Sequence, residues 1–496
     1  MKNMKKMKRL VALALSVVMV LAMSVFAFAA ETHQITVKDT DNHTYAIYQI
    51  FTGDFADNTL SNVKWGVNGT GKTGDSVNDD TLKALTDVNS KSEREILAVV
   101  EQCANLTGNP VGTVDKDNPY AAVPGYYLIK DAAAVSNNDT YTTYIVKVVG
   151  ENVEIARKAN VPSFEKKIKD TNDTTGDTSD WQDSADYDIG DQVPFQLKGT
   201  VASNYDAYKT YYFAFHDKEE RGLTFTPSSV KVYVDGKQIT SGYEVKTTGI
   251  TDGCTFEVVF DNLKDVSTVK AGSIVTVEYT SLLNNKAVLG NQGNVNEAKL
   301  VFSNNPKNEQ VGKPETPGET PWDNVIVFTY KVVVNKVNEN GAALTGAEFT
   351  LKKNIKDKDG KVTRQEPVAV VKNTAGTTFT FSGLDDGEYI LEETTTPGGY
   401  NTISPITFTV DAEHNITWEG TDRNTILGSL TGNKVSGEIT LTPNVTEGSL
   451  TTNIENKKGS TLPSTGGIGT TIFYVVGAIL MVGAAVLLIT KRRAEN

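Results

Sequence analysis

An uncharged run near the C-terminal end constrains the fold of this sequence more than any other feature. Residues 471–489 contain no charged side chain, and Lys491, Arg492 and Arg493 follow almost at once. At 1.5 Å per residue, the run spans about 28 Å as a helix, close to the roughly 30 Å hydrocarbon core of a bilayer. The run therefore predicts a transmembrane helix, and its basic flank predicts a cytoplasmic end.

The N-terminal end predicts export. An apolar stretch over residues 10–28 closes on the small-x-small pattern of residues 27–29, and five basic residues precede it: Lys2, Lys5, Lys6, Lys8 and Arg9. We expect residues 1–29 to be a secretory signal peptide. The whole chain has a formal net charge of −13. Without its two basic ends the body is more acidic still, which excludes nucleic acid as a partner.

Histidine and cysteine are too scattered to predict a metal or redox centre. The four histidines are His33, His43, His216 and His414, and the two cysteines are Cys103 and Cys254. This spacing matches no zinc signature, haem attachment site or disulfide framework. We therefore expect no metal and no cofactor. An exported chain that cannot form a disulfide framework needs another source of stability outside the cell.

The composition between the two ends is typical of all-β modules. A length of 496 residues predicts about three domains, and 39% hydrophobic content supports several cores. Short strand-like runs alternate with turn residues, and apolar residues approximate helical spacing only between Thr81 and Leu106. The predicted organisation is a signal peptide (1–29), an N-terminal domain with a small helical element (30–160), a middle β-sandwich (161–305), a Pro-rich linker (306–324), a C-terminal β-sandwich (325–458) and a C-terminal segment (459–496).

A five-residue pattern lies directly before the apolar run: Leu462, Pro463, Ser464, Thr465 and Gly466. Pattern, apolar run and basic tail in this order resemble the cell-wall sorting signal of Gram-positive surface proteins. The resemblance implies that sortase cleaves after Thr465 and passes its acyl group to the sortase cysteine and then to an amine. The alternative is a permanent single-pass membrane protein.

Residues 149–158 resemble the pilin motif of sortase-assembled backbone pilins, a hydrophobic strand that ends in Val-Tyr-Pro-Lys. The spacing and the lysine match, whereas Ala156 and Arg157 replace the Tyr-Pro pair and Val149 replaces the opening tryptophan. The resemblance implies that Lys158 is the amine that accepts the next subunit. A solvated lysine at a domain junction is the alternative.

Residues 389–400 resemble the E-box of pilin and collagen-adhesin B-type domains, with Glu393 rather than Glu392 at the acidic position. Residues 332–337 and 450–457 match the family's first and last strands. The resemblance implies an isopeptide triad of Lys336, Glu393 and Asn456. Burial would leave the lysine neutral and the glutamate protonated, so that the amine could attack the amide and release ammonia. A charged cluster on strand surfaces is the alternative.

The middle unit offers a parallel set. Residues 162–168 resemble the entry strand of the pilins' middle domain, and a period of two favours Lys166 over Lys167. Asp217 matches the family's acidic position. The acceptor is Asn304, which shares the apolar face of its strand, with Asn305 as the register alternative. The alternative is that the lysine lies on the surface and the asparagine in a turn, with no reaction between them.

Taken over the whole chain, these motifs resemble the major pilin of Gram-positive sortase-assembled fimbriae. The implied fold is mainly β, with tandem immunoglobulin-like, collagen-adhesin-type sandwiches. The implied function is structural rather than enzymatic: a covalent homopolymer anchored to peptidoglycan, with sortase and tip or minor pilins as partners. The alternative is a monomeric wall-anchored adhesin or minor pilin that binds a host ligand.

Overall fold

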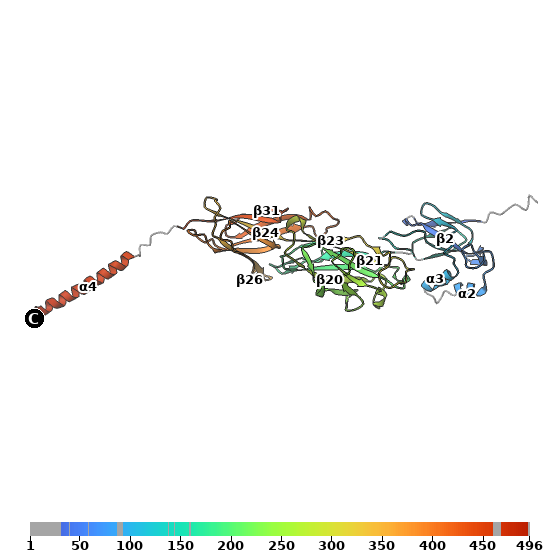
Figure 1. Ribbon diagram of the computed structural model, residues 1–496, viewed down its shortest axis with the longest axis horizontal. Helices are drawn as coiled ribbons and strands as arrows, with labels where there is room; N and C mark the ends of the chain where they lie inside the picture. Colours follow the sequence, from blue (N-terminus) through green and yellow to red (C-terminus); the bar gives the residue numbers. More distant parts are fainter. Residues whose placement is uncertain are drawn as a thin grey trace, which may run out of the picture.

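The computed structural model describes residues 31–494 apart from 39, 58, 87–92, 137, 143, 158–159 and 460–467. Three β-rich bodies lie in a row, and a long helix extends from the end that carries the third body (Figure 1). The predicted mainly β fold of tandem domains is confirmed. The expected signal peptide lies outside the described residues.

The first body is built on a sheet with a core on each face. Along β2, Tyr45 and Ile47 enter one core, and Ala46 and Tyr48 enter the other, because successive side chains point to opposite faces. Helices α2 and α3 lie at the predicted helical element, and the second core includes Val100 of α3. The elements are β1 (His33–Val37), β2 (Tyr45–Ala56), β3 (Thr59–Trp65), α2 (Asp79–Thr86), α3 (Glu93–Gln102), β4 (Gly112–Val114), β5 (Tyr120–Ala122), β6 (Gly125–Asp131), β7 (Ile145–Val149) and β8 (Val153–Ile155).

The second body is a sandwich of two sheets, with strand orders β12-β23-β21-β14-β19-β18 and β17-β16-β20-β13-β9. Strand β20 alternates between buried and partly exposed residues, as a strand with one face in a core should. Its strands are β9 (Ser163–Ile168), β10 (Thr171–Asn172), β11 (Asp177–Thr178), β12 (Ser184–Asp186), β13 (Gln192–Thr200), β14 (Phe213–Glu219), β15 (Leu223–Phe225), β16 (Lys231–Val234), β17 (Lys237–Ile239), β18 (Glu244–Lys246), β19 (Phe256–Phe260), β20 (Ile274–Leu283), β21 (Asn294–Phe302), β22 (Gly318–Glu319) and β23 (Asp323–Phe328). Short 3-10 turns lie at Tyr205–Ala207, Pro227–Ser229, Leu263–Asp265 and Gly290–Gln292.

The third body is a sandwich with strand orders β27-β24-β32-β31 and β26-β25-β28-β29-β30. Its first and last strands, β24 and β32, pair in parallel. The strands are β24 (Tyr330–Asn338), β25 (Glu348–Lys356), β26 (Val362–Val371), β27 (Thr378–Leu384), β28 (Gly387–Thr395), β29 (Ile406–His414), β30 (Leu427–Ser436), β31 (Thr442–Asn444) and β32 (Ser449–Asn456).

Strand β23 shifts the boundary expected between the second and third domains. The sequence assigns residues 325–334 to one opening strand of the third domain, but β23 pairs with β21 and β12 of the middle sandwich. Val325 and Val327 enter the core of the middle domain, whereas Ile326 and Phe328 enter the core of the third. By its hydrogen bonds β23 belongs to the middle sandwich, and Thr329 separates it from β24 of the third.

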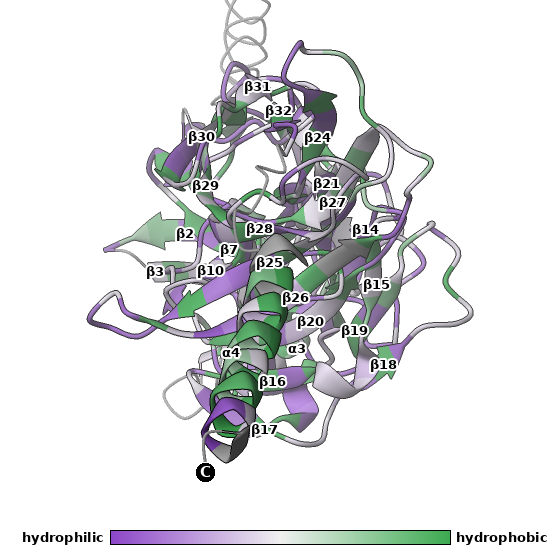
Figure 2. Cartoon of the chain, turned by 90° about the vertical axis from the view of Figure 1, so that its left-hand side faces the viewer, coloured by the Kyte–Doolittle hydropathy of each residue, from purple (hydrophilic) through white to green (hydrophobic). Residues whose placement is uncertain are grey.

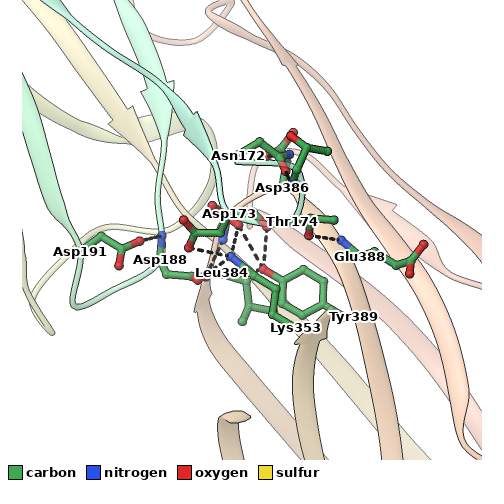
Figure 3. Close-up of polar contacts among 12 residues, drawn as sticks. Asn172, Asp173, Thr174, Asp188, Asp191, Lys353, Leu384, Asp386, Glu388 and Tyr389 are labelled. Atoms are coloured by element: carbon green, nitrogen blue, oxygen red, sulfur yellow. Dashed lines mark hydrogen bonds and ion pairs between the residues drawn. The ribbon is translucent and has the colours of Figure 1, made fainter. Parts of the chain in front are cut away.

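Polar contacts between the second and third bodies centre on Lys353 of β25 (Figure 3). Its ammonium lies 2.5 Å from a carboxylate oxygen of Asp188 in the second domain and 2.5 Å from one of Asp385 in the third. Burial lowers the pKa of Lys353, but the two aspartates outweigh this effect and raise it overall. The lysine is therefore charged, and it joins the two sandwiches electrostatically.

The C-terminal helix α4 (Ile468–Ala494) lies apart from the three bodies (Figure 1). Figure 2 shows it hydrophobic along most of its length and hydrophilic near its C-terminal end. Residues Ile472–Arg492 are long and apolar enough to cross a membrane, and none of this span is buried against the protein. The helix predicted from the uncharged run is present.

Candidate functional site

The third domain brings together the lysine, glutamate and asparagine that its motifs predict. Lys336 lies on β24, Glu393 on β28 and Asn456 at the end of β32. The parallel register places Lys336 opposite Ile454, so Asn456 lies two residues further along the neighbouring strand and on the same face. The side chains of Lys336 and Glu393 are fully buried, as is Asn456.

Glu393 lies between the amine and the amide of this cluster. The Lys336 Nζ is 3.9 Å from Glu393 Oε1, and Asn456 Nδ2 donates a hydrogen bond of 3.0 Å to Glu393 Oε2. Within the described part of the chain, Glu393 Oε1 and the amide oxygen Oδ1 of Asn456 are buried without a hydrogen-bond partner. The carboxyl group of Glu393 therefore contacts the amide of Asn456 directly and lies within 4 Å of the amine of Lys336.

Burial also prepares Lys336 for nucleophilic chemistry. It lowers the pKa of this lysine to about 8, so a substantial fraction of the amine is neutral near neutral pH. The Nζ donates a 2.8 Å hydrogen bond to the carbonyl oxygen of Ile454, which holds it beside the last strand. The neighbouring Glu392 instead pairs with Lys352 at 2.7 Å, and both are partly exposed. Glu393 is therefore the carboxyl group that the fold aims at the amine.

The middle domain holds a second buried lysine–carboxyl pair. Lys166 on β9 and Asp217 on β14 are both fully buried, and Lys166 Nζ lies 2.5 Å from Asp217 Oδ2. The hydroxyl of Tyr279, on β20, accepts from Lys166 at 2.8 Å and donates to Asp217 at 2.6 Å. Burial lowers the pKa of Lys166 and raises that of Asp217, which favours the neutral forms of both groups. Lys167 pairs with Asp183 at 2.6 Å and is not part of this group.

The asparagine beside this pair is Asn296, not the predicted Asn304. Asn296 is fully buried and donates a 2.9 Å hydrogen bond to the Tyr279 hydroxyl, while its Oδ1 is buried without a partner among the described residues. Asn304 lies beyond the end of β21, where its carbonyl oxygen accepts from the backbone of Tyr141 in the first domain. Asn305, the register alternative, caps a turn by accepting from the backbone of Lys307.

Asn296 and the predicted Asn304 differ in their position along the strand. The alternation of β21 was correctly predicted, since Ala298, Leu300 and Phe302 belong to the core of the middle domain. Asn296 lies on the same face at the other end of the run, and Asp217 pairs in register with Ala298, one position further along that face. Periodicity defines a face but not which of its residues meets the lysine. Tyr279 has no sequence signal beyond its place in an apolar strand.

The remaining predicted site residues lie outside the described residues. These are Lys158 and the sorting pattern Leu462, Pro463, Ser464, Thr465 and Gly466. The strand before Lys158 is β8, which pairs in parallel with β1. Arg157, the residue before Lys158, is partly buried and donates to Asp139 and to the carbonyl oxygen of Thr140.

Family models match two parts of the chain. Residues 330–424 match a prealbumin-like fold domain, and residues 454–496 match the LPXTG cell wall anchor motif. The first match spans most of the third sandwich, including Lys336 and Glu393. The second spans Asn456, the sorting pattern and α4.

Three comparisons cover most of the chain. The trypsin-resistant surface T6 protein of Streptococcus pyogenes serotype M6 is 27% identical over 397 residues, which cover 68% of this chain and 70% of that protein. The solved T6 backbone pilin of serotype M6 Streptococcus pyogenes gives a TM-score of 0.54 at 18% identity and covers 87% of this chain and 99% of its own. The full-length major pilin SpaD of Corynebacterium diphtheriae gives a TM-score of 0.47 at 16% identity, covering 87% of this chain and 98% of its own.

Tandem β-sandwiches ahead of a cell wall anchor motif define a class of covalently anchored surface proteins. Within that class, the prealbumin-like domain and the similarity to the T6 protein make this chain resemble a sortase-anchored major pilin. The predicted resemblance to this family and the predicted cell-wall location are confirmed.

Proposed function

We propose that the chain is the backbone subunit of a covalent pilus and that sortase joins its copies head to tail through Thr465 and Lys158. The anchor motif supports Thr465 as the acyl donor, because transfer of an acyl group through a sortase thioester needs this threonine. Lys158 is supported by its place at the end of the pilin-like segment, three positions after the end of β8 in the sequence. Tip or minor pilins and peptidoglycan are the other proposed acceptors or partners.

Each of the two C-terminal sandwiches also forms an internal isopeptide bond in this proposal. In the third domain, Lys336 Nζ attacks the side-chain carbonyl carbon of Asn456, and Glu393 donates a proton to its oxygen and then transfers protons to the leaving nitrogen. A new C–N bond replaces the amide C–N bond, and ammonia leaves. In the middle domain, Lys166 and Asn296 react in the same way, with Asp217 as the carboxyl group. The reaction occurs once per molecule, without turnover.

The observation that carries this proposal is the buried arrangement of Lys336, Glu393 and Asn456. Folding holds the amine and the amide together in one fully buried cluster, and such proximity can reach effective molarities of about 10⁵ M or more. A bond there would join the first and last strands of the sandwich. Tension along a fibre would then pass through covalent bonds instead of separating the sheets, which is the property that a shaft needs.

Intact mass spectrometry and peptide mapping test the internal bonds. The purified chain should weigh less than its sequence by one ammonia per bond. Mapping should join the Lys336 and Asn456 peptides, and the Lys166 and Asn296 peptides. A mass equal to that of the unmodified sequence would refute both bonds.

Immunoblots of cell-wall extracts test the polymer. Lys158→Ala should abolish the ladder of high-mass species and leave a folded monomer that is still attached to the wall, since Thr465 and both internal clusters are unchanged. Lys147→Ala, on the preceding strand β7, is the matched control and should keep the ladder. A ladder that survives Lys158→Ala would identify another lysine as the acceptor. A wild type that never polymerises beside a pilus-type sortase would favour the monomeric adhesin.

A further inference from the structure

The strand that carries Asp217 presents a second set of chemically active side chains on its opposite face. Because side chains alternate along β14, His216 points away from the core that holds Asp217. Glu257 lies directly opposite His216 in the antiparallel register with β19. Asp252 and Cys254 come from the turn that leads into β19. The topology thus gathers four possible metal ligands that lie up to 41 positions apart in the sequence.

These side chains are close enough to share one ion. The His216 Nδ1 lies 2.7 Å from Asp252 Oδ2 and 3.4 Å from Glu257 Oε1. The ligand atoms of His216, Asp252 and Cys254 all lie within 4.8 Å of one another. Zinc bonds of about 2.0–2.3 Å in a tetrahedral site place ligand atoms roughly 3.3–3.8 Å apart. Small side-chain movements are therefore sufficient for His216, Asp252 and Cys254 to reach a common centre, with Glu257 Oε1 beside the ligand atom of His216.

The surroundings of His216 leave its ring available to a metal. The residue is fully buried, and its Nε2 atom has no hydrogen-bond partner among the described residues. Without an ion, the carboxylate of Asp252 can only accept, so the neutral ring carries its proton on Nδ1. An ion that lies between Asp252 and Glu257 takes the place of that proton, which moves to Nε2.

The chemistry of the set selects the ion. Imidazole and thiolate ligands favour zinc over calcium or magnesium, which prefer oxygen ligands alone. A structural disulfide is not an alternative use of Cys254, because the other cysteine, Cys103, belongs to a core of the first domain. A zinc ion bound by one thiolate, two carboxylates and a neutral imidazole would carry one net negative charge.

We propose that His216, Asp252, Cys254 and Glu257 form a Zn²⁺ site on the outer face of β14 and β19. Binding forms one Zn–S, one Zn–N and two Zn–O bonds, and the thiol proton of Cys254 passes to solvent. No group is oxidised or reduced. The ion ties the turn at 251–255 to the two strands, next to the lysine–carboxyl cluster on the other face. The site does not depend on polymerisation or on the internal cross-links.

Metal titration of the full chain, purified in mild detergent and stripped with a chelator, tests the site. Isothermal titration with Zn²⁺ should give one ion per chain. Replacement by Co²⁺ should produce a thiolate-to-cobalt charge-transfer band. Cys254→Ser and Asp252→Asn should each weaken zinc binding by about 10–100-fold or more, and Cys254→Ser should also remove the band. Cys103→Ser is the matched control and should change neither result.

The outcomes separate a zinc site from simpler possibilities. Asp252 is exposed, so Asp252→Asn tests binding with little risk to folding. An unchanged mass deficit in each variant would show that the adjacent cluster still forms. Failure of the wild type to bind zinc, or retention of full affinity by both Cys254→Ser and Asp252→Asn, would overturn the proposal. Calcium binding without a cobalt–thiolate band would also overturn it, because an oxygen-only site does not use Cys254.

Discussion

Replacement of Glu393 by glutamine isolates the contribution of the third-domain cross-link. Glutamine has nearly the same shape and keeps an oxygen that can accept from Asn456, but it cannot donate a carboxyl proton. We expect the Glu393→Gln chain to fold with Lys336 and Asn456 unlinked. After allowance for the substitution itself, its intact mass should therefore exceed that of the wild type by one ammonia.

The stability change follows from the loop that the bond closes. A cross-link between Lys336 and Asn456 encloses about 120 residues, for which the chain-entropy relation gives about 5 kcal/mol of stabilisation. For a domain of this size, that loss lowers the melting temperature by roughly 15–20 °C. Glu392→Gln is the matched control. Its partly exposed pair with Lys352 contributes less than about 1 kcal/mol, so its melting should hardly change.

Differential scanning calorimetry and trypsin digestion, each paired with intact mass, measure this effect. The Glu393→Gln chain should melt lower and be cut faster, while its mass shows that the bond is missing. If it melts like the wild type despite the missing bond, the loop-entropy reasoning is wrong. If its mass equals that of the cross-linked chain after allowance for the substitution, Glu393 does not supply the proton, and the proposed mechanism fails.

Three further predictions concern the middle domain and its joint with the third. Asn296→Ala should remove the middle cross-link from peptide maps, whereas Asn304→Ala should keep it. Loss of the cross-link in Asn304→Ala but not in Asn296→Ala would identify Asn304 as the acceptor. Lys353→Met should lower the free energy of unfolding by about 3–5 kcal/mol in urea titrations, because it leaves buried aspartates unpaired; a change below 1 kcal/mol would refute this. Burial, with smaller contributions from neighbouring carboxylates, raises the pKa values of Asp191 and Asp386 to about 6. As the pH falls, the folded state therefore binds these protons at a higher pH than the unfolded state does. The contribution of the two groups to the free energy of unfolding is present below about pH 4 and is lost as the pH rises to 6. Urea titrations across this range should show that loss, and it should be smaller in Asp191→Asn; an equal slope in the variant would contradict the assignment.

Local sequence patterns predicted the third-domain cluster because each member lies on a strand with a recognisable motif. The resemblance of residues 332–337, 389–400 and 450–457 to the family's strands and E-box implied Lys336, Glu393 and Asn456, and the three side chains do lie together. A period of two selected Lys166 and rejected Lys167, and the ion pair of Lys167 with Asp183 agrees with that choice.

Features that depend on how strands pair across a sheet were missed. Asn296 meets Asp217 and Tyr279 only because β21 pairs with β14 in one particular register, which periodicity does not define. His216 and Cys254 are separated by 38 positions and match no ligand spacing, yet a loop that returns to β14 brings them together. Strand β23 was assigned to one domain, because a continuous apolar run does not reveal that its two faces serve different cores.

The shared strand also determines how a load crosses the joint. Thr329 is the only residue between β23, held in the middle sandwich, and β24, held in the third. Because β23 lies between β12 and β21, and β24 between β27 and β32, pulling on this segment shears whole ladders of hydrogen bonds at once. A flexible tether would instead let each sandwich swivel and peel open from an edge. The two domains share one nearly continuous extended segment and therefore resist bending at the joint. The joint is then no weaker to a pull along the chain than the domains that it connects.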